Sequence, residues 1–189
     1  MALAGLLAGL VTASQAAVET YKIDPVHSSV AFSIKHFVSK VPGSFTKFAG
    51  ALTLDRDNME NSSVEATIDV GSVSTASEKR DAHLKTPDFF DAAKFPTITF
   101  KSKSWKKTGD DTYDVTGDLT IKDVTKEVVL KVTSLGFAPG MQGVQLSGWE
   151  GTTTLKRSDF NVVPSAMLNK VLGDDVAISI SLEADLKKS

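Results

Sequence analysis

Arginine and histidine side chains are the groups in this sequence best suited to bind or transform a ligand. Arg80 is the strongest candidate to bind a phosphate or carbonyl oxygen, because a guanidinium presents a planar fork of donors. His83 follows three residues later, a spacing that makes two side chains neighbours on a helix. The alternative is structural, with a buried histidine bonded to the backbone or Arg80 paired with a carboxylate. The residues concerned are Arg80, Arg157, His27, His36 and His83, with Asp81 or Asp24 as the carboxylate.

The sequence carries no recognised catalytic signature. G-x-S-x-G, P-loop, H-E-x-x-H and G-x-G-x-x-G patterns are all missing. Because the chain has no cysteine, thiol catalysis, cysteine-bound zinc and iron–sulfur clusters are excluded. The three histidines lack the local spacing of zinc ligands, and no two of the 23 acidic residues stand out as a glycosidase pair. We therefore expect a binding protein without a metal or cofactor, and not an enzyme.

Length and charge predict one globular domain that does not bind nucleic acid. The chain has 189 residues, of which 41% are hydrophobic and 23% charged, as in ordinary folded domains. A formal net charge of −2 leaves no basic surface for a phosphate backbone. The lysines at positions 101, 103, 106 and 107 are typical of a solvated strand face. A transient contact of these lysines with an anionic membrane surface is the lesser alternative.

The first 16 residues resemble a secretory signal peptide. An apolar run ends in Ser14-Gln15-Ala16, a small-x-small cleavage pattern, and is shorter than the ~20 residues that span a bilayer. The run lacks the usual basic residue at its start, so an apolar helix of the domain is the alternative. A secreted chain without cysteine is typical of a bacterial periplasm. We therefore predict a signal peptide at 1–16 and a periplasmic domain at 17–189.

From Tyr21 onward, apolar and polar residues alternate with the period of a β-strand. Short turn signals separate these segments, which indicates antiparallel hairpins. Residues 76–84 break the alternation and favour a short helix. About eight or nine strands make a sandwich or a barrel, and eight strands can close around one small ligand. The strand candidates are 30–36, 48–54, 64–70, 97–105, 113–121, 128–135, 144–156 and 176–182.

A series of motifs between Tyr21 and Leu186 resembles the YceI-like family of polyisoprenoid-binding proteins, in the order found in that family. The sequence departs from the family pattern at Asp123 and Asn161, where glycine is usual. These departures alter a turn and the loop after residue 160. The motifs include Ile23-Asp24-Pro25-x-His27-Ser28, Glu78-Lys79-Arg80-Asp81-Ala82-His83-Leu84, Phe95-Pro96-Thr97-Ile98 and Arg157-Ser158-Asp159-Phe160.

The resemblance implies an all-β fold: an extended, antiparallel, eight-stranded, lipocalin-like barrel with a short helix between strands. It further implies an apolar tunnel for a polyisoprenoid or similar long-chain lipid, with a polar head group at the tunnel mouth. A homodimer is left open. The expected tunnel residues are Phe32, Ile34, Phe45, Phe48, Leu52, Phe89, Phe90, Phe100, Leu119 and Ile178, and the expected mouth residues are His36, Arg80, His83 and Arg157.

Two classes of function stay open on these grounds. The leading one is a periplasmic carrier for the lipid, linked to isoprenoid quinone or prenyl-diphosphate handling or to stress. The alternative is an enzyme or stress-response interaction protein that acts on a bound lipid with the same barrel. Ten of the 14 aromatic residues are phenylalanine, which suits an apolar lining, although for any single phenylalanine an ordinary core position is the better interpretation.

Overall fold

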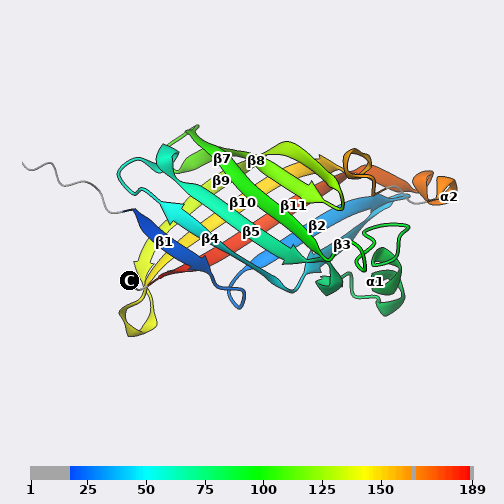
Figure 1. The fold of residues 1–189 in the computed structure, drawn as a ribbon, viewed down its shortest axis with the longest axis horizontal. Helices are drawn as coiled ribbons and strands as arrows, with labels where there is room; N and C mark the ends of the chain where they lie inside the picture. Colours follow the sequence, from blue (N-terminus) through cyan, green and yellow to red (C-terminus); the bar gives the residue numbers. More distant parts are fainter. Residues whose placement is uncertain (1–17, 163–164, 188–189) are drawn as a thin grey trace, which may run out of the picture.

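Alternating strands of the described chain, residues 18–162 and 165–187 of a computed structural model, join into one antiparallel sheet that closes on itself (Figure 1). The sheet order is β1-β4-β5-β7-β8-β9-β10-β11-β2-β3-β6, and β1 also pairs with β11. β1 (Glu19–Ile23) continues into β2 (Ser29–His36), and both pair with β11. β3 (Ser39–Phe45) likewise continues into β4 (Phe48–Leu54). β5 (Ser63–Asp69) similarly leads through a 3₁₀ turn into β6 (Val73–Ser74), which pairs with β3. Counting each of these three continuations as one stave, the eleven strands form eight staves, so the predicted fold is confirmed.

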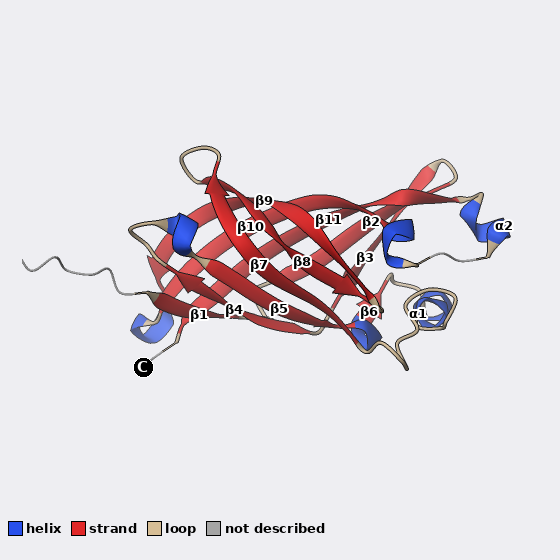
Figure 2. Ribbon diagram, turned by 45° about the horizontal axis from the view of Figure 1, so that its top comes forward, coloured by secondary structure: helices blue, strands red, loops and turns tan. Residues whose placement is uncertain are grey.

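The other strands complete the ring, and the helical turns lie at its two ends (Figure 2). The strands are β5 (Ser63–Asp69), β6 (Val73–Ser74), β7 (Thr97–Lys107), β8 (Thr112–Ile121), β9 (Val124–Pro139), β10 (Gln145–Lys156) and β11 (Leu172–Leu186). The helices are α1 (Glu78–Leu84) and α2 (Ala166–Asn169), with 3₁₀ turns η1 (Met59–Asn61), η2 (Val70–Ser72), η3 (Met141–Gly143) and η4 (Arg157–Phe160).

The helix predicted at 76–84 is present but begins two residues later, at Glu78. Ala76 has a φ of 59°, a left-handed conformation that cannot continue into a right-handed helix. The segment after α1 folds into hydrogen-bonded turns, in which Phe89 N–H donates to the Thr86 carbonyl at 3.0 Å. No helix of the described segments is long and apolar enough to cross a membrane.

The break between β1 and β2 is bridged by one side chain. The Ser28 hydroxyl donates to the Glu183 carbonyl at 3.2 Å and accepts from the Glu183 N–H at 3.0 Å. Asp24 N–H also donates to the Glu183 carbonyl, at 2.9 Å. The pairing along β11 therefore continues across the gap between the two shorter strands.

Two glycines that the sequence places on apolar strand faces do not leave vacant space. A Cβ on Gly117 would lie 2.6 Å from the Phe100 ring, and one on Gly50 would meet the Glu65 carbonyl and the Ile23 side chain. Gly43 similarly faces the Phe32 ring on the neighbouring strand. Because these three glycines have no side chain, a large side chain on the neighbouring strand can lie directly over the glycine backbone.

Two apolar clusters fill opposite ends of the elongated barrel. We call the end that carries α1 and α2 the helix end, and the opposite end, near the C-terminus, the aromatic end (Figure 1). The aromatic-end cluster contains Tyr21, Ile23, Leu52, Leu54, Trp105, Tyr113, Val115, Trp149 and Ala184. The helix-end cluster contains Phe45, Val70, Val73, Phe89, Ile98, Ile121, Phe160 and Val162.

Candidate functional site

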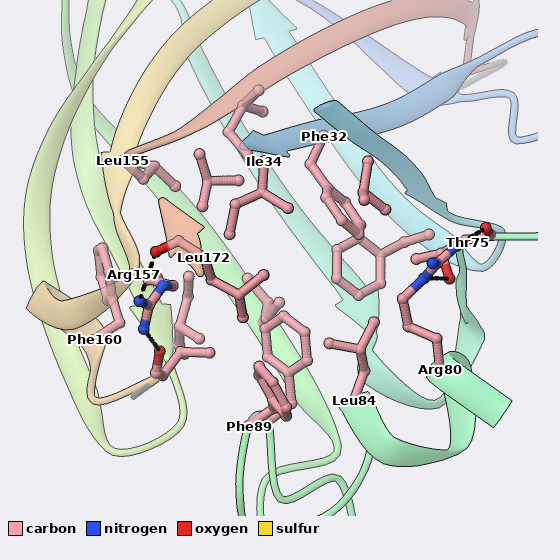
Figure 3. A pocket seen from close by; sticks show the side chains of 18 of the residues that line it. Phe32, Ile34, Thr75, Arg80, Leu84, Phe89, Leu155, Arg157, Phe160 and Leu172 are labelled. Carbon is pink, nitrogen blue, oxygen red and sulfur yellow. Dashed lines mark hydrogen bonds between the residues drawn. The ribbon is translucent and has the colours of Figure 1, made fainter. Parts of the chain in front are cut away.

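A cavity of about 340 Å³ lies inside the helix end of the barrel (Figure 3). Its wall consists of inward side chains of the strands, closed by residues of α1, η4 and α2 such as Leu84, Phe160 and Leu168. The wall is almost entirely apolar, and a volume of this size is typical of a small-molecule pocket. We call this space the main cavity.

A smaller cavity of about 130 Å³ lies toward the aromatic end, between Trp105, Trp149 and their neighbours. Four side chains line both cavities: Val30, Ile68, Leu119 and Leu155. The two spaces therefore adjoin along one ring of aliphatic residues. Together they follow the long axis of the barrel, which suits an extended hydrocarbon chain better than a compact ligand.

All ten residues expected to form the tunnel line one of these cavities. For eight of them, this position comes from the two-residue alternation of a strand, which directs every second side chain inward. Phe89 and Phe90 instead lie in the turns after α1. Phe32, Ile34, Phe45, Phe89, Phe90 and Ile178 line the main cavity, Phe48, Leu52 and Phe100 line the smaller one, and Leu119 lines both.

Some of these phenylalanines also pack against each other. The Phe45 ring lies 5.7 Å from that of Phe32 and 5.9 Å from that of Phe90, between ring centroids. Phe45 and Phe89 are buried within the helix-end cluster. The same rings thus serve as core and as cavity wall, so the two interpretations of a phenylalanine in the sequence do not exclude each other.

The four expected mouth residues, His36, Arg80, His83 and Arg157, all line the main cavity. Figure 3 shows Arg80 and Arg157 on opposite sides of it. Sequence reasoning missed other lining residues, among them Thr75, Val41, Leu168 and Leu172. Leu168 and Leu172 lie in and just after α2, a single turn of helix without a periodic pattern that could reveal it.

Arg80 is fastened to the strand beside it, as the structural alternative proposed, but through another partner. Its Nε donates to the Thr75 hydroxyl at 2.7 Å and its Nη2 to the Thr75 carbonyl at 2.6 Å. Asp81 accepts from the Thr75 N–H at 2.8 Å and from its hydroxyl. Arg80 and Asp81 therefore grip the same threonine instead of each other, and Nη1 of Arg80 makes no hydrogen bond to the described residues.

Arg157 is a buried cation, 9% exposed, whose hydrogen bonds all go to neutral acceptors. Its guanidinium donates to the Gly173 carbonyl at 2.9 Å, the Val162 carbonyl at 3.1 Å and the Asn169 side-chain oxygen at 2.9 Å. These bonds tie η4, α2 and the start of β11 together. Asp159, two residues further along the same motif, does not pair with Arg157 but lies 3.5 Å from the ammonium group of Lys126.

An acidic residue next to this cation has a perturbed pKa. The Asp174 carboxylate accepts from the Ser158 hydroxyl at 2.7 Å. This hydrogen bond is the main cause that lowers the pKa of Asp174, and the positive charge of Arg157 contributes in the same direction. Asp174 therefore stays ionised near Arg157 and partly balances its buried charge.

The histidines divide between two places. His36 reaches the main cavity, as its strand alternation predicts, and its ring contacts Phe37 edge-on at 4.9 Å between centroids. His83 Nε2 lies 3.1 Å from an Asp88 carboxylate oxygen. His27 belongs to one of the family motifs but does not line either cavity, and it forms an ion pair with Asp24.

The group around His27 is the set of side chains in the described chain that could hold a metal ion. Donor atoms of Asp24, His27 and Glu183 all lie within 4.8 Å of one another. His27 Nδ1 is 2.6 Å from Asp24 and 3.6 Å from Glu183. This hydrogen bond lowers the pKa of Asp24 and raises that of His27. The pair thus satisfies itself, and we assign no metal to it.

The arrangement at the main cavity suits binding more than bond breaking. A catalytic site needs a nucleophile or general base within hydrogen-bond reach of an activating partner and of the substrate. Here the polar side chains lie around an apolar space, and both arginines are bonded chiefly to structural acceptors. Such a cavity can exclude water from a hydrocarbon chain and place its polar end beside cationic and imidazole groups.

Comparison with known proteins agrees with the fold and the motifs. Residues 21–184 match the model of the YceI-like domain family. The chain is 41% identical to a UPF0312 protein of Ectopseudomonas mendocina over 165 residues, covering 85% of this chain and 86% of that protein. It is 40% identical to Protein YceI of Escherichia coli over 154 residues, covering 80% of each chain.

Solved structures of similar fold include proteins from two other bacteria. BcnA of Burkholderia cenocepacia superposes with a TM-score of 0.78 at 28% identity, covering 85% of this chain and 98% of BcnA. A polyisoprenoid-binding domain from Saccharophagus degradans superposes with a TM-score of 0.69 at 14% identity, covering 90% of this chain and all of that domain. With its family model, relatives and barrel in agreement, the chain belongs to the YceI-like family.

Proposed function

We propose that this protein binds a polyisoprenoid or similar long-chain amphiphilic lipid inside the barrel and carries it through the periplasm. The single observation that supports this most is the main cavity, about 340 Å³ of apolar space that continues toward a second cavity. The Saccharophagus degradans domain, named for polyisoprenoid binding, has the same fold. That likeness supports the architecture, and the apolar lining supports the class of ligand.

The binding energy comes from the hydrocarbon chain. Burial of each CH₂ group contributes about 0.8 kcal/mol. Ordering the chain and losing its free motion removes a large part of that gain, yet many buried carbons leave a substantial net affinity. Specificity by length and shape follows, because little of the wall offers a hydrogen bond.

The polar head is proposed to lie at the helix end. His36, Arg80, His83 and Arg157 line the main cavity there, and Nη1 of Arg80 is available to an oxygen of the ligand. The hydrocarbon chain would extend past Leu119 toward the smaller cavity. A phosphate or carbonyl head group fits this polar surrounding.

We propose the periplasm as the compartment because residues 1–16, which lie outside the described residues, resemble a secretory signal peptide. Handling of isoprenoid quinones or prenyl diphosphates, or a role in stress, is the physiological setting that we propose. The protein acts by holding the lipid, without a chemical step. A homodimer stays a prediction from the family resemblance.

Native mass spectrometry combined with organic extraction tests the binding proposal. The full chain, purified from a bacterial host, should carry a lipid that is recovered unchanged after incubation. Leu119→Trp fills the ring between the cavities and should remove the longest lipids. Leu135→Trp makes the same change on an exposed position of β9 and should retain them.

Two results would contradict the proposal. One is a wild-type protein that carries no lipid and takes up no added isoprenoid alcohol or diphosphate. The other is a bound lipid that is converted into a product over time, which would favour the enzyme alternative.

A further inference from the structure

The two-residue turn between β2 and β3, Phe37 and Val38, presents apolar side chains at the helix end of the barrel. Phe37 is 59% exposed and Val38 is fully exposed, while the flanking His36 and Ser39 pair across the hairpin. Phe37 has a φ of 49°, at a turn position where glycine or asparagine is usual. A bulky residue rarely adopts this conformation, so turn stability does not explain the choice of phenylalanine.

Helix α2 adds a third apolar side chain beside this turn. Phe37 N–H donates to the Val171 carbonyl at 3.0 Å, and Val171 N–H donates to the Leu168 carbonyl at 3.0 Å. Met167 on α2 is 77% exposed, whereas the next residue, Leu168, lines the main cavity. We call Phe37, Val38 and Met167 the apolar tip.

Lysine side chains surround the apolar tip. Lys35 and Lys40 are directly opposite each other across the hairpin, an arrangement of like charges that destabilises a strand pair. Lys170 follows α2, and all three are exposed. None of these lysines forms an ion pair within the residues that the structure describes. We call them the basic collar.

The acidic residues that follow Gly173, which lies against Lys35, already have other partners. Asp174 accepts hydrogen bonds from Ser158, and Asp175 pairs with Lys156 at 3.0 Å. Unlike the collar lysines, two lysines on β7 form ion pairs: Lys101 with Glu65 at 2.7 Å and Lys103 with Asp118 at 2.6 Å. The collar therefore offers unpaired positive charge beside exposed apolar side chains, whereas β7 carries no exposed large apolar residue.

We propose that the apolar tip inserts into the surface of an anionic lipid bilayer, with the basic collar on the lipid head groups. Apolar side chains that project from a small convex tip and are ringed by lysine suit the membrane interface. A protein partner of ordinary size would need a broader surface with less lysine. The proposal deepens the proposed function, because the tip lies beside residues that line the main cavity and would bring that cavity to its source of lipid.

Vesicle co-sedimentation of the full chain tests this attachment. The wild type should bind vesicles of phosphatidylglycerol and phosphatidylcholine more strongly than vesicles of phosphatidylcholine alone, and added salt should weaken the binding. Phe37→Gly combined with Val38→Asn suits the turn and keeps the fold, yet should lower the bound fraction by roughly tenfold or more. Lys35→Glu combined with Lys40→Glu should remove the preference for phosphatidylglycerol.

The matched control changes two exposed apolar residues elsewhere. Val26 is 81% exposed and Met141 is 91% exposed, and both lie outside the tip. Val26→Ser combined with Met141→Ser should leave vesicle binding unchanged. Equal loss in the control and tip variants, or no vesicle binding by the wild type, would overturn the proposal. Recovery of a stoichiometric protein partner through the tip, without vesicle binding, would also overturn it.

The two proposals fail in different ways. Lipid extracted from the tip variant should match the wild type, because the variant leaves the main cavity intact. If neither the wild type nor the variants contain lipid but the wild type still binds vesicles, the carrier function fails and the docking surface stands. If the wild type contains lipid but ignores vesicles, the reverse holds.

Discussion

The helix end and the aromatic end of this barrel share the same staves but differ in how their interiors are filled. At the aromatic end, the Trp105 and Trp149 rings meet at 90° with centroids 5.5 Å apart, and Tyr21 is buried beside Phe137. At the helix end, phenylalanine and aliphatic side chains surround about 340 Å³ of open space. Strand number fixes the width of a barrel, so the size of the inward side chains decides whether a cavity remains.

The polar groups differ between the ends in the same sense. At the aromatic end, burial raises the pKa of Tyr21 to about 12, with a further contribution from its hydrogen bond to Glu19. The indole N–H groups of Trp105 and Trp149 have no hydrogen-bond partner within the described residues. At the helix end, both arginines are bonded to protein acceptors. The aromatic end therefore relies chiefly on ring packing, while the helix end relies on polar ties around its cavity.

The largest predicted effect compares the loss of one ring from the aromatic end with the loss of one ring from the helix end. Trp149→Ala should lower the free energy of unfolding by about 3–5 kcal/mol, because it removes a fully buried ring from the aromatic-end cluster and enlarges the void beside it. Phe90→Ala should cost roughly half as much, since Phe90 is only half-buried and loses less apolar contact. Urea denaturation of both variants measures the difference. Equal losses would mean that the helix end is packed as firmly as the aromatic end.

The next prediction concerns the buried cation. Arg157→Met should lower the free energy of unfolding by roughly 2–4 kcal/mol, because three backbone carbonyls and one amide oxygen lose a charged donor. Arg56→Met is the matched change at the aromatic end, where the guanidinium lies 4.2 Å from the Phe137 ring centroid and is half-exposed. It should cost about 1 kcal/mol or less. A similar loss in both variants would remove the distinction between the ends.

A smaller effect is expected where α1 is fastened to β6. Thr75→Val keeps the shape of the side chain but removes the hydroxyl between Arg80 and Asp81, which should cost about 1–2 kcal/mol. Amide hydrogen exchange should quicken in α1 and stay unchanged around Trp149. Uniform exchange throughout the chain would show that the two ends unfold together.

The smallest effect follows from the exposed ion pair of Asp24 and His27. The raised pKa of His27 stabilises the fold below pH 6.5, and this contribution is lost as pH rises through the folded value. The lowered pKa of Asp24 stabilises it above pH 3.8, and that contribution is lost as pH falls through the folded value. The difference in stability between wild type and His27→Gln should therefore be largest between these limits. A difference that grows above pH 7 would contradict the ion pair.

Strand alternation and family motifs were enough to predict the barrel, the short helix and the inward-facing strand residues that line the cavities, but not the whole lining. Phe32, Ile34 and His36 face inward because a strand turns each side chain by half a revolution, which sequence spacing records directly. The partner of Arg80 could not be predicted, because Thr75 precedes the helix in a stretch without periodicity. Leu168 and Leu172 were missed because no periodicity marks this segment either. Its position depends on hydrogen bonds from Arg157 to Asn169 and Leu172, which the sequence does not reveal.

The hydroxyl of Ser28 also bears on the resistance of this barrel to aggregation. A gap in a stave leaves unpaired peptide groups, which can recruit a strand from another chain and begin aggregation. By occupying both the N–H and the carbonyl of Glu183, a single oxygen atom takes the place of a missing backbone neighbour. The break between β1 and β2 therefore does not expose the peptide groups of Glu183 to pairing with a strand of another molecule.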